Sequence, residues 1–435
     1  MTKQHNLGSI ALAPYWLTAH PVHLYKSDHS WWFEPIGHYD TIIFAGPFIE
    51  NGSHRSITQN IITAKTHGLS WSILDIQLYL SNNWGINLRD ISMLWHVIEA
   101  SATCRVRDLP ELACPLIAVI ADTHHLAAPI SSLLMYLRCS QYTHLTCTHN
   151  QHTPFFAAAI DIPTFSFPYT YLNAKKCQRE LIRKKDLIYY GNLVSSHHVF
   201  RTKFINKILS CSSLRLGGRL SFHRWLDALA QGGQCVFTCS LNGSFSFQTL
   251  MPLLHRNAII TDPICSANWL GKLLPYLPDC HVFHDLEECL NIVQYIETED
   301  SDGCTSKIEA LTSELLKPFL SNQKILRNAF CPGKFYPEVL PDASTDSEKW
   351  LLSILTTARR KFGLVEVERM IKLYEIIQEQ HRIHWRIGIT SITEMSKKSL
   401  IYDAFLMQMP TMLPRLKYPD PQGIHVQDLE VAITS

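Results

Sequence analysis

The stretch LIAVIADTHHLAAPI, residues 116–130, carries an apolar run directly into one aspartate and two histidines. Histidine titrates near neutral pH, and a carboxylate beside it can orient the ring. Asp122 with His124 or His125 therefore has the residue types of a general base. An aspartate at the end of a strand also caps a following helix, and paired histidines also serve as hydrogen-bonded loop residues. Both interpretations are open at this point.

Three further segments place polar residues directly after apolar runs that we predict to be strands. Gly191 and Asn192 follow LIYY, residues 240–248 (SLNGSFSFQ) follow CVFT, and Thr261 and Asp262 follow AII. Ligands of open parallel sheets collect at the carboxyl ends of strands, where loops and helix N-termini converge. We therefore expect these three segments and the aspartate–histidine segment to hold the site.

Residues 240–248 have the composition of a phosphate-binding turn. Asn242 and Gly243 predict a tight turn shortly before a helix, and a small residue there lets backbone N–H groups approach a phosphate that the helix dipole favours. Ser244 and Ser246 can contact such a phosphate, but they are equally good N-caps of a plain strand-to-helix turn.

Two cations and two more histidines are further candidates. Arg201 and Lys203 lie at the head of a predicted helix, where they either neutralise a diphosphate or are solvated surface cations. His149 and His152 follow the next predicted strand, so we expect them at the same sheet edge as His124 and treat them as reserve candidates. The Thr-Pro pair that follows them is typical of a helix start, so these polar residues also suit capping.

Apolar runs alternate with amphipathic stretches along most of the chain, which is typical of parallel sheets covered by helices on both faces. One series spans residues 1–175 and a second spans 186–340, with the polar and basic stretch 173–185 as a linker between them. The predicted fold class is α/β, with two Rossmann-like domains that face a cleft. Residues 341–435 are predicted to form a helical appendix and a tail.

Some helices are predicted from only a few apolar residues with helical spacing. Ile57, Ile61 and Ile62 have helical spacing and predict a helix over residues 54–68. Residues 88–102 (LRDISMLWHVIEASA) predict another helix. The C-terminal stretch has Val367, Met370, Ile371, Tyr374 and Ile377 on one helical face.

The charge balance argues against nucleic acid or an anionic membrane as a partner. The chain has 39 basic and 38 acidic residues, a formal net charge of +1, so it has no global field to hold a polyanion. No stretch reaches the roughly 18 apolar residues of a transmembrane helix, and the N-terminus lacks the pattern of a signal peptide. We therefore expect a cytoplasmic protein with no transmembrane segment.

The 13 cysteines and 22 histidines lack the spacing of a metal site. No Cys-x-x-Cys pair occurs, and the His-x-x-His pairs are joined neither to a cysteine pair nor to a His-Glu-x-x-His helix. We expect no bound metal. The scattered cysteines are typical of small core residues in a reducing compartment.

Three stretches of the sequence resemble bacterial glycosyltransferases of the GT-B fold. CSLNGSFSFQTLMPLLHRNAIITD is similar to a donor-side segment that reads Ser-Leu-Asn-Gly, Asn-Leu-Arg, Phe-Glu, a Gly-Gly turn and a strand ending in Thr-Asp. DTHH with YLRCSQYTHLTCTHNQHTPFF resembles the N-terminal domain of the same group, and LIYYGNLVSSHHVFRTKFINKIL resembles the opening of its donor domain. The resemblance covers roughly residues 110–290, in the same order.

The resemblance implies a metal-independent transferase that moves a sugar from a nucleotide-sugar co-substrate, with no other cofactor. It implies His125 or His124 as the base and Asp122 as its orienter. The acceptor would be a hydroxyl of a glycan, a lipid-linked group or a protein, and the architecture is compatible with a homo-oligomer. The implied donor contacts are Gly191, Asn192, Arg201, Asn242, Gly243, Ser246, Gln248 and Asp262.

The chain departs from the family pattern at three points. Gln248 stands where the pattern has Arg, Met251 stands where it has the Glu that holds the donor ribose, and Arg256-Asn257 replaces the Gly-Gly turn. A thioether cannot accept hydrogen bonds from two hydroxyl groups, so either another residue supplies the ribose contact, the donor is unusual, or the donor site has decayed. The last case would leave a GT-B-like binding or assembly protein without catalysis. A further alternative is an epimerase or phosphate-group transferase of the same architecture.

Overall fold

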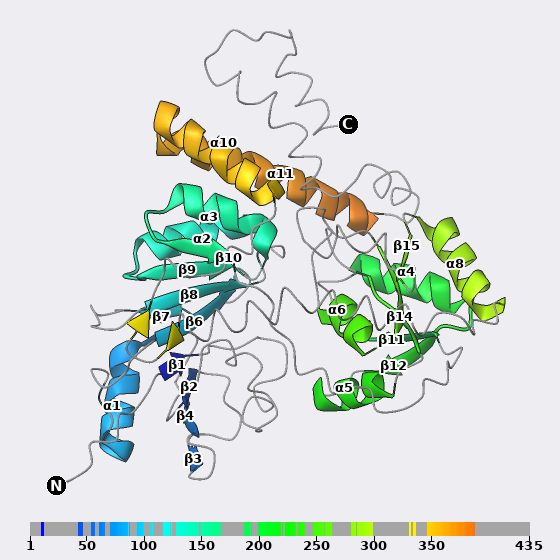
Figure 1. Cartoon of the computed structure of the whole chain (residues 1–435), viewed down its shortest axis with the longest axis horizontal. Coiled ribbons are helices and arrows are strands. Elements are labelled where there is room, and N and C mark those ends of the chain that lie inside the picture. The colour runs from blue at the N-terminus through cyan, green and yellow to red at the C-terminus, as the bar shows by residue number, and fades with distance from the viewer. Residues whose placement is uncertain are drawn as a thin grey trace. The chain divides into compact units, whose positions relative to one another are not determined.

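The computed structural model shows two compact units (Figure 1). One consists of Met1–Leu172 with Lys317–Ser344, and the other of Asn173–Leu316 with Thr345–Ser435. The structure describes residues 10–12, 42–46, 54–56, 61–65, 70–85, 87, 94–99, 105–107, 116–121, 123, 128–147, 149–166, 187–191, 193, 199–218, 220, 222–231, 234–239, 247–255, 257–262, 280–283, 285–298, 330–331, 334–335 and 346–387.

The first unit contains an eight-stranded sheet in the order β10-β9-β8-β6-β1-β2-β4-β3. Among these strands only β3 runs antiparallel, beside β4. Numbered along the chain, the seven parallel strands have the 3-2-1-4-5-6 order of a doubly wound fold with one strand added, and the direction of winding reverses between β1 and β6. The strands are β1 (Ile10–Leu12), β2 (Ile42–Gly46), β3 (His54–Ser56), β4 (Ile61–Lys65), β6 (Leu94–Glu99), β8 (Leu116–Ala121), β9 (His144–Cys147) and β10 (Thr164–Ser166).

Helices and a strand pair complete the first unit. They are β5 (Ser70–Ser72) paired with β7 (Arg105–Arg107), α1 (Ile73–Trp84), α2 (Pro129–Arg138), the 3₁₀ turn Asn150–His152 and α3 (Thr153–Ala159). Residues 116–120 of β8 are all buried, which explains their unbroken apolar run, because both faces of a central parallel strand are covered. α2 buries Ile130, Leu133, Leu134 and Leu137, which share one helical face.

Two helices predicted for the first unit are wrong. Strands β3 and β4 occupy residues 54–56 and 61–65, and β6 occupies residues 94–99 of the second predicted helix. Short apolar runs rich in isoleucine and valine are compatible with a buried strand as well as with a helix. In these two segments, pairing with neighbouring strands of the sheet favours the strand. Residues 69–76 (LSWSILDI) have the apolar pattern of one strand, but β5 covers only Ser70–Ser72 because α1 begins at Ile73.

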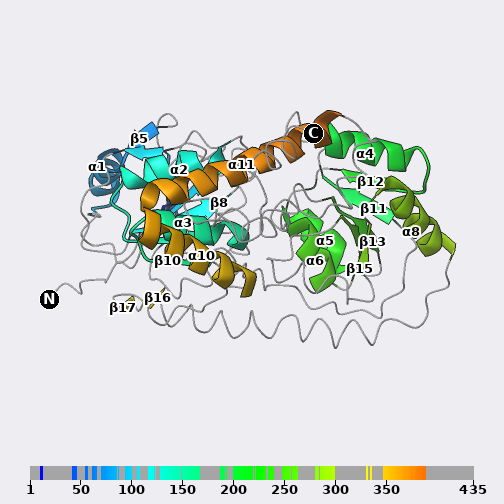
Figure 2. The ribbon, with the colours of Figure 1, turned by 90° about the horizontal axis from the view of Figure 1, so that it is seen from above.

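The sheet of the second unit is fully parallel over its described strands, in the order β12-β11-β13-β14-β15. This is the 2-1-3-4-5 order, the other common doubly wound arrangement, and winding reverses between β11 and β13. The elements are β11 (Leu187–Tyr190), α4 (Val199–Leu209), β12 (Arg215–Gly218), α5 (Phe222–Ala230), β13 (Cys235–Phe237), α6 (Phe247–Leu254), β14 (Ala258–Thr261), β15 (Cys280–Val282) and α8 (Leu286–Thr298). Helices α4 and α8 cover one face of the sheet, and α5 and α6 lie on the other (Figures 1 and 2). The prediction of an α/β fold with parallel, Rossmann-like sheets is confirmed.

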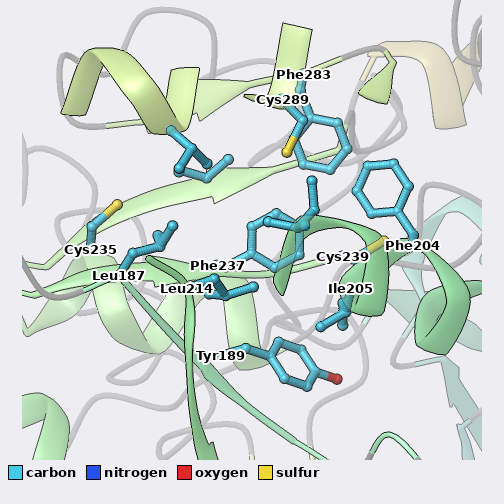
Figure 3. Packing of buried hydrophobic residues seen from close by; sticks show 13 residues of the cluster. Leu187, Tyr189, Phe204, Ile205, Leu214, Cys235, Phe237, Cys239, Phe283 and Cys289 are labelled. Atoms are coloured by element: carbon cyan, nitrogen blue, oxygen red, sulfur yellow. The ribbon is translucent and has the colours of Figure 1, made fainter. Parts of the chain in front are cut away.

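Three phenylalanines form the centre of the core between this sheet and its helices α4 and α8. Phe283 stacks against Phe204 and Phe237, with ring centroids 5.3 and 5.8 Å apart. In both pairs the ring planes are nearly parallel. Figure 3 shows the three rings gathered together with Tyr189 beside Phe237. The cluster joins β11, β13 and β14 to α4 and α8, so it fixes the start of α4 relative to the strand ends.

Two long helices follow, α10 (Asp346–Phe362) and α11 (Leu364–Ile387), with β16 (Phe330–Cys331) and β17 (Lys334–Phe335) before them. Gly363 separates the helices with φ of +86°, a left-handed conformation that favours glycine. The apolar face predicted for α11 is confirmed at Val367, Met370, Ile371 and Tyr374, which are buried. The side chain of Ile377 lies outside the described residues. α11 contacts α4 within the second unit.

Candidate functional site

The carboxyl ends of β8 and β9 gather polar residues in the first unit. These strands are parallel neighbours, so Thr123, which follows β8, and His149 and His152, which follow β9, lie at one edge of the sheet. All three side chains are buried. Asp122, His124 and His125 lie outside the described residues.

A side-chain contact joins the two segments at this edge. The Thr123 hydroxyl and His152 Nδ1 form a hydrogen bond between residues 29 positions apart in the chain. His152 ends the 3₁₀ turn, where its backbone N–H donates to the His149 carbonyl at 2.9 Å. The expectation that the two segments come together at one sheet edge is thus met at Thr123 and His152.

The His152 ring is held neutral. Burial lowers its pKa well below the usual value, and the neighbouring His149 adds to this effect. The ring is 1% exposed, with the ring centroids of His149 and Phe155 at 6.2 and 6.4 Å. A neutral, enclosed imidazole is suited to a fixed hydrogen bond within the protein.

The second unit gathers its polar residues where the winding of its sheet reverses. Gly191 follows β11, and Thr202 of α4 donates a short hydrogen bond to the Leu193 carbonyl, which ties the β11–α4 connection to the helix. A Cβ atom on Gly191 would lie 2.6 Å from the Tyr189 hydroxyl oxygen. The packing of Tyr189 therefore requires glycine here, whatever ligand the edge binds.

Arg201, in the first turn of α4, reaches the same edge. Burial raises the pKa of the Tyr189 hydroxyl, and the Arg201 guanidinium opposes this rise. Burial also raises the pKa of the Cys239 thiol well above its usual value, with Asp262 adding to the rise and Arg201 opposing it. Cys239 therefore lies within electrostatic range of both Arg201 and Asp262.

Strand register explains why these residues meet. Phe237 of β13 pairs with Ile260 of β14, and the ladder continues with the Thr238 N–H donating to the Ile260 carbonyl at 2.8 Å. Cys239 and Asp262 each lie two residues beyond that registered pair, so they come side by side on the face that α4 covers. Asp262 is 4% exposed.

Two side chains at positions that the resemblance predicted to bind the donor make structural contacts instead. Gln248 Nε2 donates to the Tyr190 carbonyl at 3.3 Å and so supports the end of β11. Met251, at the position of the ribose-binding glutamate, is 2% exposed and packs into the interior. Neither side chain supplies the charge that the family pattern has there.

Asn257, which replaces a glycine of the family's turn, is a hydrogen-bond hub. Its Oδ1 accepts from the Gln234 N–H at 3.1 Å, and its amide group donates to the carbonyls of Leu229, Pro252 and His255 at 3.0, 3.3 and 3.2 Å. These bonds tie the ends of α5 and α6 to the starts of β13 and β14. The turn is thus held by the Asn257 side chain.

Asn257→Ala is expected to lower the free energy of unfolding by about 2 kcal/mol, because it removes the side-chain partner of the buried Gln234 N–H and the amide donor to the Leu229 carbonyl. Urea unfolding of the full chain measures this. Asn206→Ala, on an exposed position of α4, is the control and should change stability by less than about 0.5 kcal/mol. Equal, small effects of both substitutions would contradict the role of Asn257.

The structure places four of the eight predicted donor contacts: Gly191, Arg201, Gln248 and Asp262. All four lie at or directly support the carboxyl edge of the second sheet. Sequence reasoning missed Thr123, Tyr189 and Cys239, although each lies inside or next to a segment it had selected. The other four contacts lie outside the described residues: Asn192, Asn242, Gly243 and Ser246.

Within the described residues, no three His, Cys, Asp or Glu side chains converge as a metal site requires. No helix in that same part of the chain is long and apolar enough to cross a membrane. No family model matches the chain, and no curated protein matches it either.

Proposed function

We propose that the protein is a glycosyltransferase of the GT-B type, which moves a sugar from a nucleotide-activated donor to a hydroxyl acceptor. The proposal rests on two doubly wound sheets with polar residues at their carboxyl edges, and on the resemblance over residues 110–290. It includes a cleft between the two domains, as the resemblance implies. The donor nucleotide would bind the second domain, and the acceptor the first.

One observation carries the proposal furthest. Arg201 lies in the first turn of the helix after β11, where the sheet reverses its winding, and it acts electrostatically on Tyr189 and Cys239 there. Doubly wound sheets bind their ligands at this reversal point. A guanidinium at that place suits the diphosphate of a leaving nucleotide, because it neutralises charge that develops when the sugar bond breaks. The reaction then needs no metal ion.

The acceptor proton would be taken at the edge of the first sheet. In this proposal His125 or His124 is the base, and Asp122 orients its ring. Thr123, which lies between them in the sequence, is held by its hydrogen bond to His152. Gly191, Asn192 and Arg201 would surround the diphosphate, with Asn242, Gly243 and Ser246 at the head of α6.

A second candidate function is a GT-B-like binding or assembly protein without catalysis. The specific observation in its favour is the interior position of Met251 together with the Gln248 bond to the Tyr190 carbonyl. No carboxylate at position 251 is available for a donor ribose. Nucleotide binding followed by a turnover assay separates the two candidates.

The first test is thermal unfolding of the full chain against UDP, GDP, CDP, CMP, dTDP and ADP. A nucleotide at about a hundred times its dissociation constant should stabilise the protein by roughly 2.7 kcal/mol. Arg201→Ala should reduce that shift, because the diphosphate loses one positively charged partner. Lys207→Ala, which removes an exposed cation from the same helix, should retain it.

Two outcomes go against the proposal in different ways. If no nucleotide raises the unfolding midpoint, the donor site is absent and the transferase proposal fails. If a nucleotide binds through Arg201 but its sugar conjugates release no nucleotide with water or glycerol as acceptor, the non-catalytic candidate is the better account.

A further inference from the structure

His152 is poorly placed to act on a substrate and well placed to hold the chain. Its ring is buried against His149 and Phe155, and its backbone is fixed by the 3₁₀ turn that leads into α3. α3 in turn is held to α2, because Arg138 donates to the Ala159 carbonyl at 3.1 Å. The ring therefore belongs to a rigid part of the first unit.

The partner of this ring lies in the middle of a segment proposed for chemistry. Thr123 is fully buried, and its hydroxyl makes its hydrogen bond to His152 across 29 residues of sequence. Strand β8 ends at Ala121, two residues before Thr123. The bond to His152 supplies a second point of support, after the strand ends.

We propose that His152 is a positioning residue: its Nδ1 accepts a hydrogen bond from the Thr123 hydroxyl and so holds Thr123, whose sequence neighbours are the residues proposed for proton transfer. This inference rests on the proposed transferase function. A ring that accepts at Nδ1 carries its proton on Nε2, and this neutral form cannot switch roles without breaking the bond to Thr123. A displacement of about 1 Å at a reacting group costs on the order of 10²-fold in rate, so a second support has a measurable value.

A matched pair of substitutions isolates the hydroxyl group. Thr123→Val keeps the shape of the side chain and removes the hydrogen bond, whereas Thr123→Ser keeps the hydroxyl. The assay is nucleotide release from the nucleotide-sugars whose nucleotide bound in the unfolding test, with water or glycerol as acceptor. We expect Thr123→Val to lower kcat by roughly 10- to 100-fold. Thr123→Ser should stay within about threefold of the wild type, and KM for the donor should change less than about twofold in both.

This split between kcat and KM distinguishes positioning from a general loss of structure. A purely structural role would lower the unfolding midpoint and the amount of active protein without this pattern. Equal kcat values for Thr123→Val and wild type would overturn the inference. So would an equal loss in Thr123→Ser, because that variant retains the donor.

Nitrogen NMR of histidine-labelled full-length protein tests the contact without any turnover. His152→Asn assigns the signal by its disappearance. We expect a single neutral form with the proton on Nε2 from pH 5 to 8. A ring that carries its proton on Nδ1, or that titrates near the ordinary value of about 6.5, would overturn the anchor. A wild type that binds nucleotide but never turns over would end the proposed function and the catalytic half of this inference, while the NMR result still decides the anchor.

Discussion

Replacing Arg201 with alanine is expected to lower kcat for sugar transfer by roughly 10²- to 10³-fold, which is the loss expected when one fixed donor to a developing negative charge is removed. Arg201 lies at the reversal point of the second sheet and acts on Tyr189 and Cys239. In the proposed reaction its charge would meet the leaving diphosphate most strongly in the transition state, so kcat should fall more than donor affinity. Nucleotide release from the cognate nucleotide-sugar, at saturating donor, measures the effect.

Two control variants bracket this result. Arg201→Lys keeps the charge but loses the planar fork, so it should recover part of the rate. Lys207→Ala removes an exposed cation from the same helix and should leave kcat unchanged. If Arg201→Ala lowers the unfolding midpoint but leaves kcat at the wild-type value, Arg201 only balances the buried Asp262, and another group meets the diphosphate.

The alternation of apolar and amphipathic stretches predicted the class of fold, because parallel strands buried on both faces require unbroken apolar runs. β8 and β14 illustrate this, since residues 116–120 and 259–261 are all buried. The first 100 residues were harder to predict. β4 and β6 are short runs whose helical spacing was accidental, and only pairing with β2 and β8 distinguishes them from helices.

The strand order was not accessible to sequence reasoning. Both sheets consist of similar strand-and-helix units, yet one has the 3-2-1-4-5-6 order and the other the 2-1-3-4-5 order. The order depends on which side of the first strand each connection crosses. The local pattern of apolar and polar residues does not indicate this. The reversal points, and hence the expected ligand edges, follow only once the order is known.

The sequence indicated which segments belong to the candidate site, but it did not indicate which of their side chains contact one another. Strand-end positions selected Gly191 and Asp262, and the head of a predicted helix selected Arg201; their role as donor contacts stays a prediction. Thr123 was assigned no role, because its neighbours Asp122 and His124 have more reactive side chains. Its partner His152 was treated as a reserve candidate for the base. A hydrogen bond between residues 29 positions apart leaves no trace in local spacing.

Phe237→Ala is expected to lower the free energy of unfolding by about 3 to 5 kcal/mol, the usual cost of deleting a buried aromatic ring. Phe237 is 1% exposed and packs against Phe204 and Phe283, which come from α4 and the end of β15. A cavity at this point removes the contact that seats α4 on the sheet. Urea unfolding of the full chain measures the loss. If the two units unfold in separate transitions, only that of the second unit should shift.

The same substitution connects the core to the proposed chemistry. Phe204 lies one helical turn after Arg201, so a poorly seated α4 leaves the guanidinium without a fixed position. At a temperature where Phe237→Ala is still folded, we expect weaker nucleotide binding as well as lower stability. Tyr295→Ala is the control, because Tyr295 of α8 is 51% exposed. This substitution should change neither stability nor nucleotide binding by much. A variant that is strongly destabilised yet binds nucleotide with wild-type affinity would show that the donor site does not depend on the seating of α4.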